Sequence, residues 1–122
     1  MIKEIKPTIY PVTIFLCIGG EMKDFGLSLS RRLKCPIRAF EEQGNAEART
    51  IINGAYSAIW IKGIPKDCDF AKVASHEAFH AAYGALEYVG IELTPQSEEA
   101  FAYMVGHIVK ELWNLREKTL SL

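Results

Sequence analysis

The feature that most constrains this chain is an H-E-x-x-H sequence at residues 76–80, inside a segment whose composition predicts a helix from about residue 70 to residue 89. Residues four apart lie one above the other on a helix, so His76 and His80 can direct two imidazoles at one ion. Glu77 lies one step round the helix, close to such an ion without being aimed at it. That position suits a base that takes a proton from a metal-activated water.

The residues around this sequence are apolar on nearly every side of the expected helix. They are Ala71, Val73, Ala74, Ala78, Phe79, Ala81, Ala82, Ala85 and Leu86. A helix that is apolar all round is normally buried. Two histidines and a glutamate at its centre are costly there unless something satisfies them. The alternative interpretation is an ordinary amphipathic helix that carries the sequence by chance.

A catalytic zinc usually takes three protein ligands and keeps its fourth position for water, so a third ligand must come from elsewhere in the chain. The downstream candidates are Glu87, Glu92, Glu98, Glu99, His107 and Glu111. Thr94 and Pro95 are typical of a helix start and predict a second helix over about residues 95–118. A turn over residues 89–93 lets this helix pack antiparallel on the first, with two of the candidate carboxylates in its first turns.

The two motifs together resemble a known family. H-E-x-x-H, then eighteen residues (81–98), then Glu99 followed by Ala-Phe-Ala is similar to the gluzincin clan of zinc metallopeptidases, and the size resembles the single-domain minigluzincins and small uncharacterised H-E-x-x-H proteins of bacteria and phages. The resemblance covers about thirty residues, 73–104. It implies that His76, His80 and Glu99 bind Zn²⁺ and that Glu77 is the general base.

The sequence departs from the gluzincin pattern in two places. Many members carry an acidic residue four positions after the third ligand, where this chain has Tyr103. Tyr103 would then bond a ligand histidine or stabilise the oxyanion during hydrolysis, or else be a half-buried core residue. Glu98 precedes Glu99 directly and is the alternative third ligand. His107 is interpreted as a partly buried structural histidine.

Size and composition describe one ordinary globular domain over residues 1–122. The chain is 49% hydrophobic with a formal net charge of −1, and its scattered basic residues do not indicate nucleic-acid binding. No run reaches the roughly twenty apolar residues that span a bilayer. Three widely spaced cysteines without C-x-x-C are typical of reduced thiols, and with no secretory pattern they predict a cytoplasmic protein. The oligomeric state is not indicated.

The remaining segments complete an expected α+β, zincin-like domain. We expect a strand at Thr8–Ile18, a helix at Met22–Leu33, a short strand at Pro36–Phe40, a loop over residues 41–47, and a hairpin pairing Arg49–Ile52 with Ala55–Lys62 through Asn53-Gly54. By the resemblance, one strand of the hairpin borders a cleft and pairs with an extended peptide. Ala58 and Trp60 are the positions expected there, although an ordinary core or sheet-surface position is the favoured interpretation of Trp60.

The function that these observations favour is zinc-dependent cleavage of a peptide or protein substrate. Two alternatives remain open at this point. The domain could be an inactive zincin-like binding or regulatory module, which suits its small size, because a peptidase cleft normally has walls on both sides. It could also be a purely structural α/β domain in which the motif occurs by chance.

Overall fold

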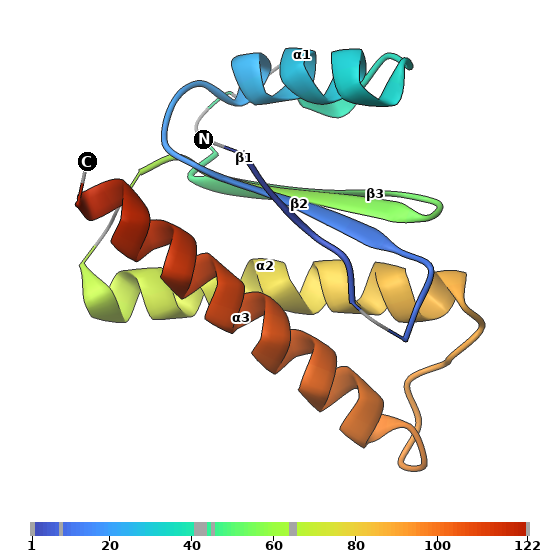
Figure 1. Cartoon of the computed structure of the whole chain (residues 1–122). Coiled ribbons are helices and arrows are strands. Elements are labelled where there is room, and N and C mark those ends of the chain that lie inside the picture. Colours follow the sequence, from blue (N-terminus) through green and yellow to red (C-terminus); the bar gives the residue numbers. More distant parts are fainter. Residues whose placement is uncertain (1, 8, 41–43, 45, 64–65, 122) are drawn as a thin grey trace.

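The fold joins a four-stranded sheet to three helices. The computed structural model describes residues 2–7, 9–40, 44, 46–63 and 66–121 (Figure 1). Its elements are β1 (Ile2–Ile5), β2 (Thr13–Ile18), α1 (Met22–Leu33), a 3₁₀ turn at Arg38–Phe40, β3 (Ala48–Asn53), β4 (Tyr56–Ile61), α2 (Asp67–Tyr88) and α3 (Glu98–Leu120). The strands lie in the order β1-β2-β4-β3, with β2 and β4 parallel and the two outer pairs antiparallel. The expected α+β class is confirmed.

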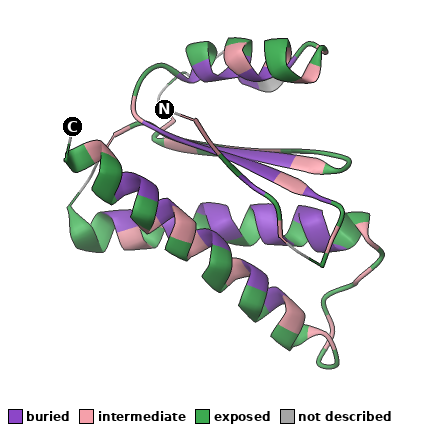
Figure 2. Ribbon diagram, viewed as in Figure 1, coloured by how far each residue is buried: buried purple, intermediate pink, exposed green. Residues whose placement is uncertain are grey.

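The sheet is covered on both faces, α1 lying on one and α2 with α3 on the other (Figure 1). Alternate residues of the central strands enter two separate cores: Ile14, Leu16, Ile59 and Ile61 face α2 and α3, while Phe15, Cys17, Ala58 and Trp60 face α1. Figure 2 shows these strands as almost continuously buried. Burial on both faces explains why β2 and β4 are apolar at nearly every position.

The hairpin and the first helix form where the sequence predicts them. β3 and β4 pair with Asn53 opposite Tyr56, and Gly54 takes a φ of 60° in the turn between them. This left-handed conformation is the one for which glycine is favoured in a tight hairpin. The helix expected at Met22–Leu33 has those bounds, and its buried side chains include Phe25 and Leu29.

The N-terminal region differs from the single long strand expected at Thr8–Ile18. β1 occupies Ile2–Ile5 and pairs antiparallel with β2, which begins only at Thr13. Between them the chain turns, with the Tyr10 amide donating to the Pro7 carbonyl over 3.3 Å. Proline lacks an amide hydrogen, so the prolines at positions 7 and 11 favour a turn over a continued strand. Thr8 lies outside the described residues.

The short strand expected at Pro36–Phe40 is wrong. The segment instead folds back on α1 as a 3₁₀ turn, and the Ile37 amide donates to the hydroxyl of Ser30 over 2.9 Å. Phe40 is fully buried against Phe25, with ring centroids 5.3 Å apart. The burial of one aromatic ring against α1 therefore decides this conformation, while the loop expected at 41–47 lies largely outside the described residues.

The two long helices pack antiparallel, as expected, although α3 begins at Glu98 rather than Pro95. Residues 95–97 form a turn, in which the Ser97 hydroxyl accepts a bond from the Thr94 amide over 2.9 Å and donates to the Glu92 carbonyl. At the opposite end of the pair, Arg116 of α3 bonds Asp67 of α2 at 2.9 Å.

The same guanidinium lies over two rings, 5.0 Å from the centre of Phe70 and 5.1 Å from that of Trp113. Arg116 is itself only 5% exposed, so its contacts with the two rings are shielded from water, where cation–π contacts are strongest, whereas the Asp67 side chain is 83% exposed. None of the helices in the described part of the chain is long and apolar enough to cross a membrane.

Small residues let α2 lie close to the edge of the sheet. Its buried positions include Ala74, Ala78, Ala81 and Ala85, and at Gly84 a Cβ atom would lie 2.6 Å from Ile52 of β3. That separation is shorter than two carbon atoms allow. Glycine at position 84 therefore permits β3 to approach α2.

Replacing Gly84 with alanine should separate two opposing effects. Alanine favours a helix over glycine by about 0.5–1 kcal/mol, but crowding against Ile52 costs about 1–3 kcal/mol. We expect Gly84→Ala to lower the free energy of unfolding by about 1 kcal/mol in the parent, and to raise it by about 0.5–1 kcal/mol when Ile52 is also changed to alanine. Urea denaturation measures both values, and equal effects in the two backgrounds would contradict the contact.

Candidate functional site

His76 and His80 meet on the outer side of α2. Their Nε2 atoms lie 3.3 Å apart, with ring centroids 4.9 Å apart and planes inclined by 71°. Both residues are exposed, the His76 side chain to 68%. The helix is thus buried on one side only, and the histidines form part of its solvent-facing stripe. The sequence-based expectation of a helix buried all round is wrong on this side.

The separation of the two Nε2 atoms is the one that a zinc site requires. Zinc binds histidine nitrogen at about 2.0–2.1 Å in tetrahedral geometry, which places two such nitrogens about 3.3–3.4 Å apart. The observed Nε2–Nε2 distance of 3.3 Å fits this value. An N–H···N hydrogen bond between the rings in complementary tautomers accounts for the same distance without a metal. The histidine pair therefore fits two of the four positions of a zinc ion.

Glu77 lies beside this pair but in a buried position. The residue is 7% exposed, and its Oε1 atom lies 4.0 Å from the Nε2 atom of His76. Its other oxygen, Oε2, accepts a 2.5 Å hydrogen bond from the hydroxyl of Thr50 on β3. One carboxylate oxygen is held by the sheet, and the other is on the side of the histidines.

The expected third ligand is not found beside His76, His80 and Glu77. Within the described ranges, no group of three or more His, Cys, Asp or Glu side chains is arranged to hold a metal ion. Glu98 and Glu99 both lie exposed in the first turn of α3. The residues present therefore fit zinc through the histidine pair alone, and the glutamate that would complete the site is separate from it.

Helical phase distinguishes the two glutamates. Glu98 lies one turn before Phe101, which is buried and packs on Tyr83 of α2 with ring centroids 6.1 Å apart. Glu99 lies one turn before Tyr103, which is 76% exposed. Residues three or four apart share a helix face, so Glu98 is on the stripe that meets α2 and Glu99 on the stripe that faces solvent. The family pattern selects Glu99, whereas the packing of α3 favours Glu98.

Tyr103 and His107 belong to a different part of the surface. Both line a hollow that α3 forms with the turn between β1 and β2, together with Lys6, Pro7, Ile9 and Tyr10. Among the described residues, neither of them makes a hydrogen bond, ion pair or ring contact with the histidine pair. The expected role of Tyr103 as an oxyanion or histidine partner is therefore not supported by its position, and its exposure also excludes the half-buried alternative.

Ala58 and Trp60 were expected to border a cleft, and this is wrong. Both are fully buried in the core under α1, on the face of the sheet away from α2. They also belong to β4, which pairs on one side with β2 and on the other with β3, so its backbone has no free edge. Trp60 is a core residue. The strand that borders α2 at the edge of the sheet is β3.

Two hollows lie along α2 on the histidine side, one on each side of the motif. The first is lined by Asp69, Lys72 and Val73 of α2, together with Glu47, which precedes β3, and Lys62, which follows β4. The second is lined by Tyr83, Gly84 and Glu87 of α2 with Ile52 and Gly54 of the hairpin. The strand β3 runs from one hollow to the other past the histidines. Among the described strands β3 is at the edge of the sheet, so an extended path runs along it from one hollow to the other.

Thr50 was missed by the sequence analysis. In β3, residues 48, 50 and 52 share the face that meets α2, whereas Ile51 packs into the core under α1. The sequence did contain an indication of this role. Thr50 places a hydroxyl on the same inward-facing side as Ala48 and Ile52, and a polar group in such a position normally has a hydrogen-bond partner.

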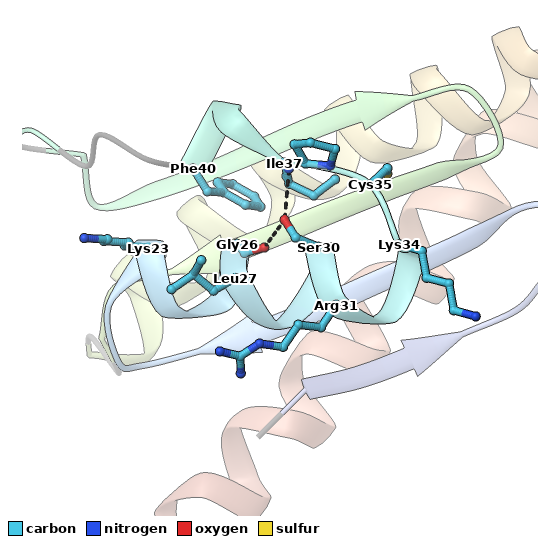
Figure 3. A pocket seen from close by; sticks show the side chains of 10 residues that line it. Lys23, Gly26, Leu27, Ser30, Arg31, Lys34, Cys35, Ile37 and Phe40 are labelled. Atoms are coloured by element: carbon cyan, nitrogen blue, oxygen red, sulfur yellow. Dashed lines mark hydrogen bonds between the residues drawn. The ribbon is translucent and has the colours of Figure 1, made fainter.

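A separate hollow beside α1 contains none of the expected site residues. Lys23, Arg31 and Lys34 stand round its rim, and Leu27, Ile37 and Phe40 supply its apolar lining (Figure 3). Ser30 closes its inner side by bonding the Gly26 carbonyl and the Ile37 amide, each over 2.9 Å (Figure 3). It lies across the sheet from the histidines, on the α1 side.

The cysteines do not supply a ligand to the histidine pair. Cys17 is buried in the core under α1, and this burial raises the pKa of its thiol. Cys35 lies 3.9 Å from the Tyr56 hydroxyl on the same side of the sheet, and Cys68 is exposed at the start of α2.

Comparisons with protein-family models, with curated proteins and with solved structures found no match for this chain.

Proposed function

We propose that this chain binds a zinc ion through His76 and His80 and cleaves peptide bonds as a small zinc-dependent peptidase of the gluzincin type. The observation that carries the proposal is the 3.3 Å separation of the two Nε2 atoms, with the Glu77 carboxylate 4.0 Å from one of them. A glutamate beside two zinc-spaced histidines is the combination that H-E-x-x-H metalloproteases use for metal-assisted hydrolysis, together with a third ligand.

In this proposal the roles of the side chains follow from their positions. A zinc ion held by these residues would lower the pKa of a bound water and would polarise a substrate carbonyl. Glu77 takes the proton of the attacking water through Oε1 and passes it to the departing amine. His76 and His80 hold the ion on the exposed face of α2, where substrate has access. A glutamate at the start of α3 completes the ligand set.

A peptide is the substrate class that the surroundings of the site favour. The edge strand β3 contacts Glu77 of the motif through Thr50, and the described residues leave the outer side of this strand unpaired. An extended peptide adds to such an edge through its backbone, while neighbouring hollows receive its side chains. The two hollows that flank the motif are on this path.

The first test is the metal content of the purified chain. We expect about one zinc per chain in the parent, as in a mononuclear site, and none in the double variant His76→Ala, His80→Ala. Both side chains are solvent-facing, so the variant should keep its fold, which circular dichroism checks. No zinc in the parent after incubation with the metal at neutral pH would reject the proposal.

The choice of third ligand is tested by a matched pair of neutral variants. We expect Glu98→Gln to weaken zinc binding by at least about 100-fold, because loss of even an outer-shell partner costs about 10–100-fold. Glu99→Gln should weaken it by about threefold or less, which is the size of an exposed charge effect. Competition with a chromophoric chelator measures both affinities. The reverse order would show that α3 turns Glu99 toward the metal.

Glu77→Gln tests the base. The amide keeps the shape and the hydrogen bond to Thr50 but cannot take a proton. Zinc content and thermal stability should remain close to the parent, whereas hydrolysis of a quenched-fluorescence peptide library should fall by about 10²–10⁴-fold, the usual contribution of general acid–base catalysis. Undiminished hydrolysis in this variant would exclude the mechanism.

A zincin-like binding module is the second candidate function. The observation in its favour is that neither glutamate of α3 joins the histidines in the described part of the chain. The two functions differ in one result, because a binding module holds peptide along β3 without cleaving it when zinc is present.

A further inference from the structure

The hydroxyl of Thr50, on strand β3, contacts Glu77 of the H-E-x-x-H motif. We infer that Thr50 is a positioning residue, which holds one oxygen of Glu77 so that the other is directed to the histidines. This inference deepens the proposed peptidase function and depends on it for its catalytic meaning. The hydrogen bond between Thr50 and Glu77 is present in the structure whether or not the chain is an enzyme.

The geometry of the contact is specific. Thr50 Oγ1 lies 2.5 Å from Oε2 of Glu77 and 3.3 Å from the backbone carbonyl oxygen of the same residue. No other hydrogen bond to this carboxylate is made by the residues that the structure describes. Glu77 is 7% exposed, so water satisfies little of its remaining capacity. Loss of the hydroxyl would leave a buried oxygen without a donor, which is the expensive outcome.

The two oxygens of Glu77 thereby acquire different surroundings. Oε2 is bonded to the sheet, and Oε1 is 4.0 Å from His76 Nε2. A carboxylate bonded at one oxygen loses the freedom to exchange its two oxygens by rotation. The free oxygen then stays on the side where a water on the histidines would lie. Such restriction of a base before substrate arrives is a known source of rate enhancement.

The position of Thr50 is fixed by its strand. Thr50 is opposite Ile59 of β4, and two residues further on Ile52 lies against Gly84 of α2. β3 is also the strand on which the proposed peptide would pair. The same element therefore places both the base and the substrate, so their relative position depends on the register of one strand.

The experiment compares Thr50→Val with Thr50→Ser in the full chain loaded with zinc. Valine keeps the shape without the hydroxyl, and serine keeps the hydroxyl. With a quenched-fluorescence peptide as substrate, we expect Thr50→Val to lower kcat by about 10–100-fold, the cost of a misplacement near 1 Å. KM should change by about twofold or less, because backbone pairing with β3 remains. Thr50→Ser should restore most of kcat. Thr50→Val with an unchanged kcat would overturn the inference.

Thr13→Val is the matched control. It makes the same exchange in β2, where the hydroxyl forms no hydrogen bond with the described residues, and it should leave kcat and KM unchanged. A general weakening of the sheet by valine would lower kcat in both variants, whereas loss of the Glu77 contact lowers it in Thr50→Val alone. Equal losses in the two variants would overturn the inference.

A second measurement separates this inference from the proposed function. In metal-free protein labelled with ¹³C, the side-chain carboxyl resonance of Glu77 should move in Thr50→Val and return toward its parental position in Thr50→Ser. An unmoved resonance overturns the inference even if the parent is active. A moved and restored resonance in a parent that binds zinc but cleaves nothing supports the contact and rejects the peptidase function.

Discussion

The close packing of α2 on the sheet is the constraint on which the site depends. The helix meets the strands through alanines at positions 74, 78, 81 and 85, each no more than 3% exposed, and through a glycine at position 84. Side chains of this size bring the helix axis near the strands, and cores tolerate little added volume at such contacts. A threonine hydroxyl on β3 can reach Glu77 only because of this approach. Larger residues on the same face would separate Glu77 from the edge strand.

Local sequence patterns predicted the parts of the fold that local physics decides. The Met22–Leu33 stripe, the Asn53-Gly54 turn and the spacing of His76 and His80 each concern residues a few positions apart, and all three have the predicted conformation. The strand expected over Arg38–Phe40 was wrong because burial of Phe40 against Phe25, fifteen residues earlier in α1, outweighs the strand propensity of the segment. The assignment of Trp60 to a cleft failed because strand order, which the sequence does not state, places β4 inside the sheet.

The candidate metal ligands also differ in whether local sequence is enough to place them. The distance between His76 and His80 follows from the pitch of one helix, so the spacing of these two residues in the sequence is enough to predict it. The third ligand depends on where α3 begins, and an ideal helix turns by about 100° per residue, so neighbouring glutamates face quite different directions. The turn at residues 95–97 delays the helix start to Glu98 and helps to set this phase. Comparison with the family motif assigns the third-ligand role to Glu99, because a motif records residue types and not the direction in which each side chain points. Thr50 escaped notice for a related reason, because its partner is 27 residues away in sequence.

The junction of Arg116 with Asp67, Phe70 and Trp113 has a mechanical consequence for the opposite end of the helix pair. It fixes α3 to α2 near Trp113, fifteen residues beyond Glu98, which corresponds to an arm of about 22 Å at 1.5 Å per residue. A change of about 10° in the angle between the helices at this pivot would move the start of α3 by about 4 Å over an arm of that length. The Arg116 junction therefore contributes to the separation between the glutamates and the histidines without touching either, together with the packing of Phe101 on Tyr83 near the start of α3.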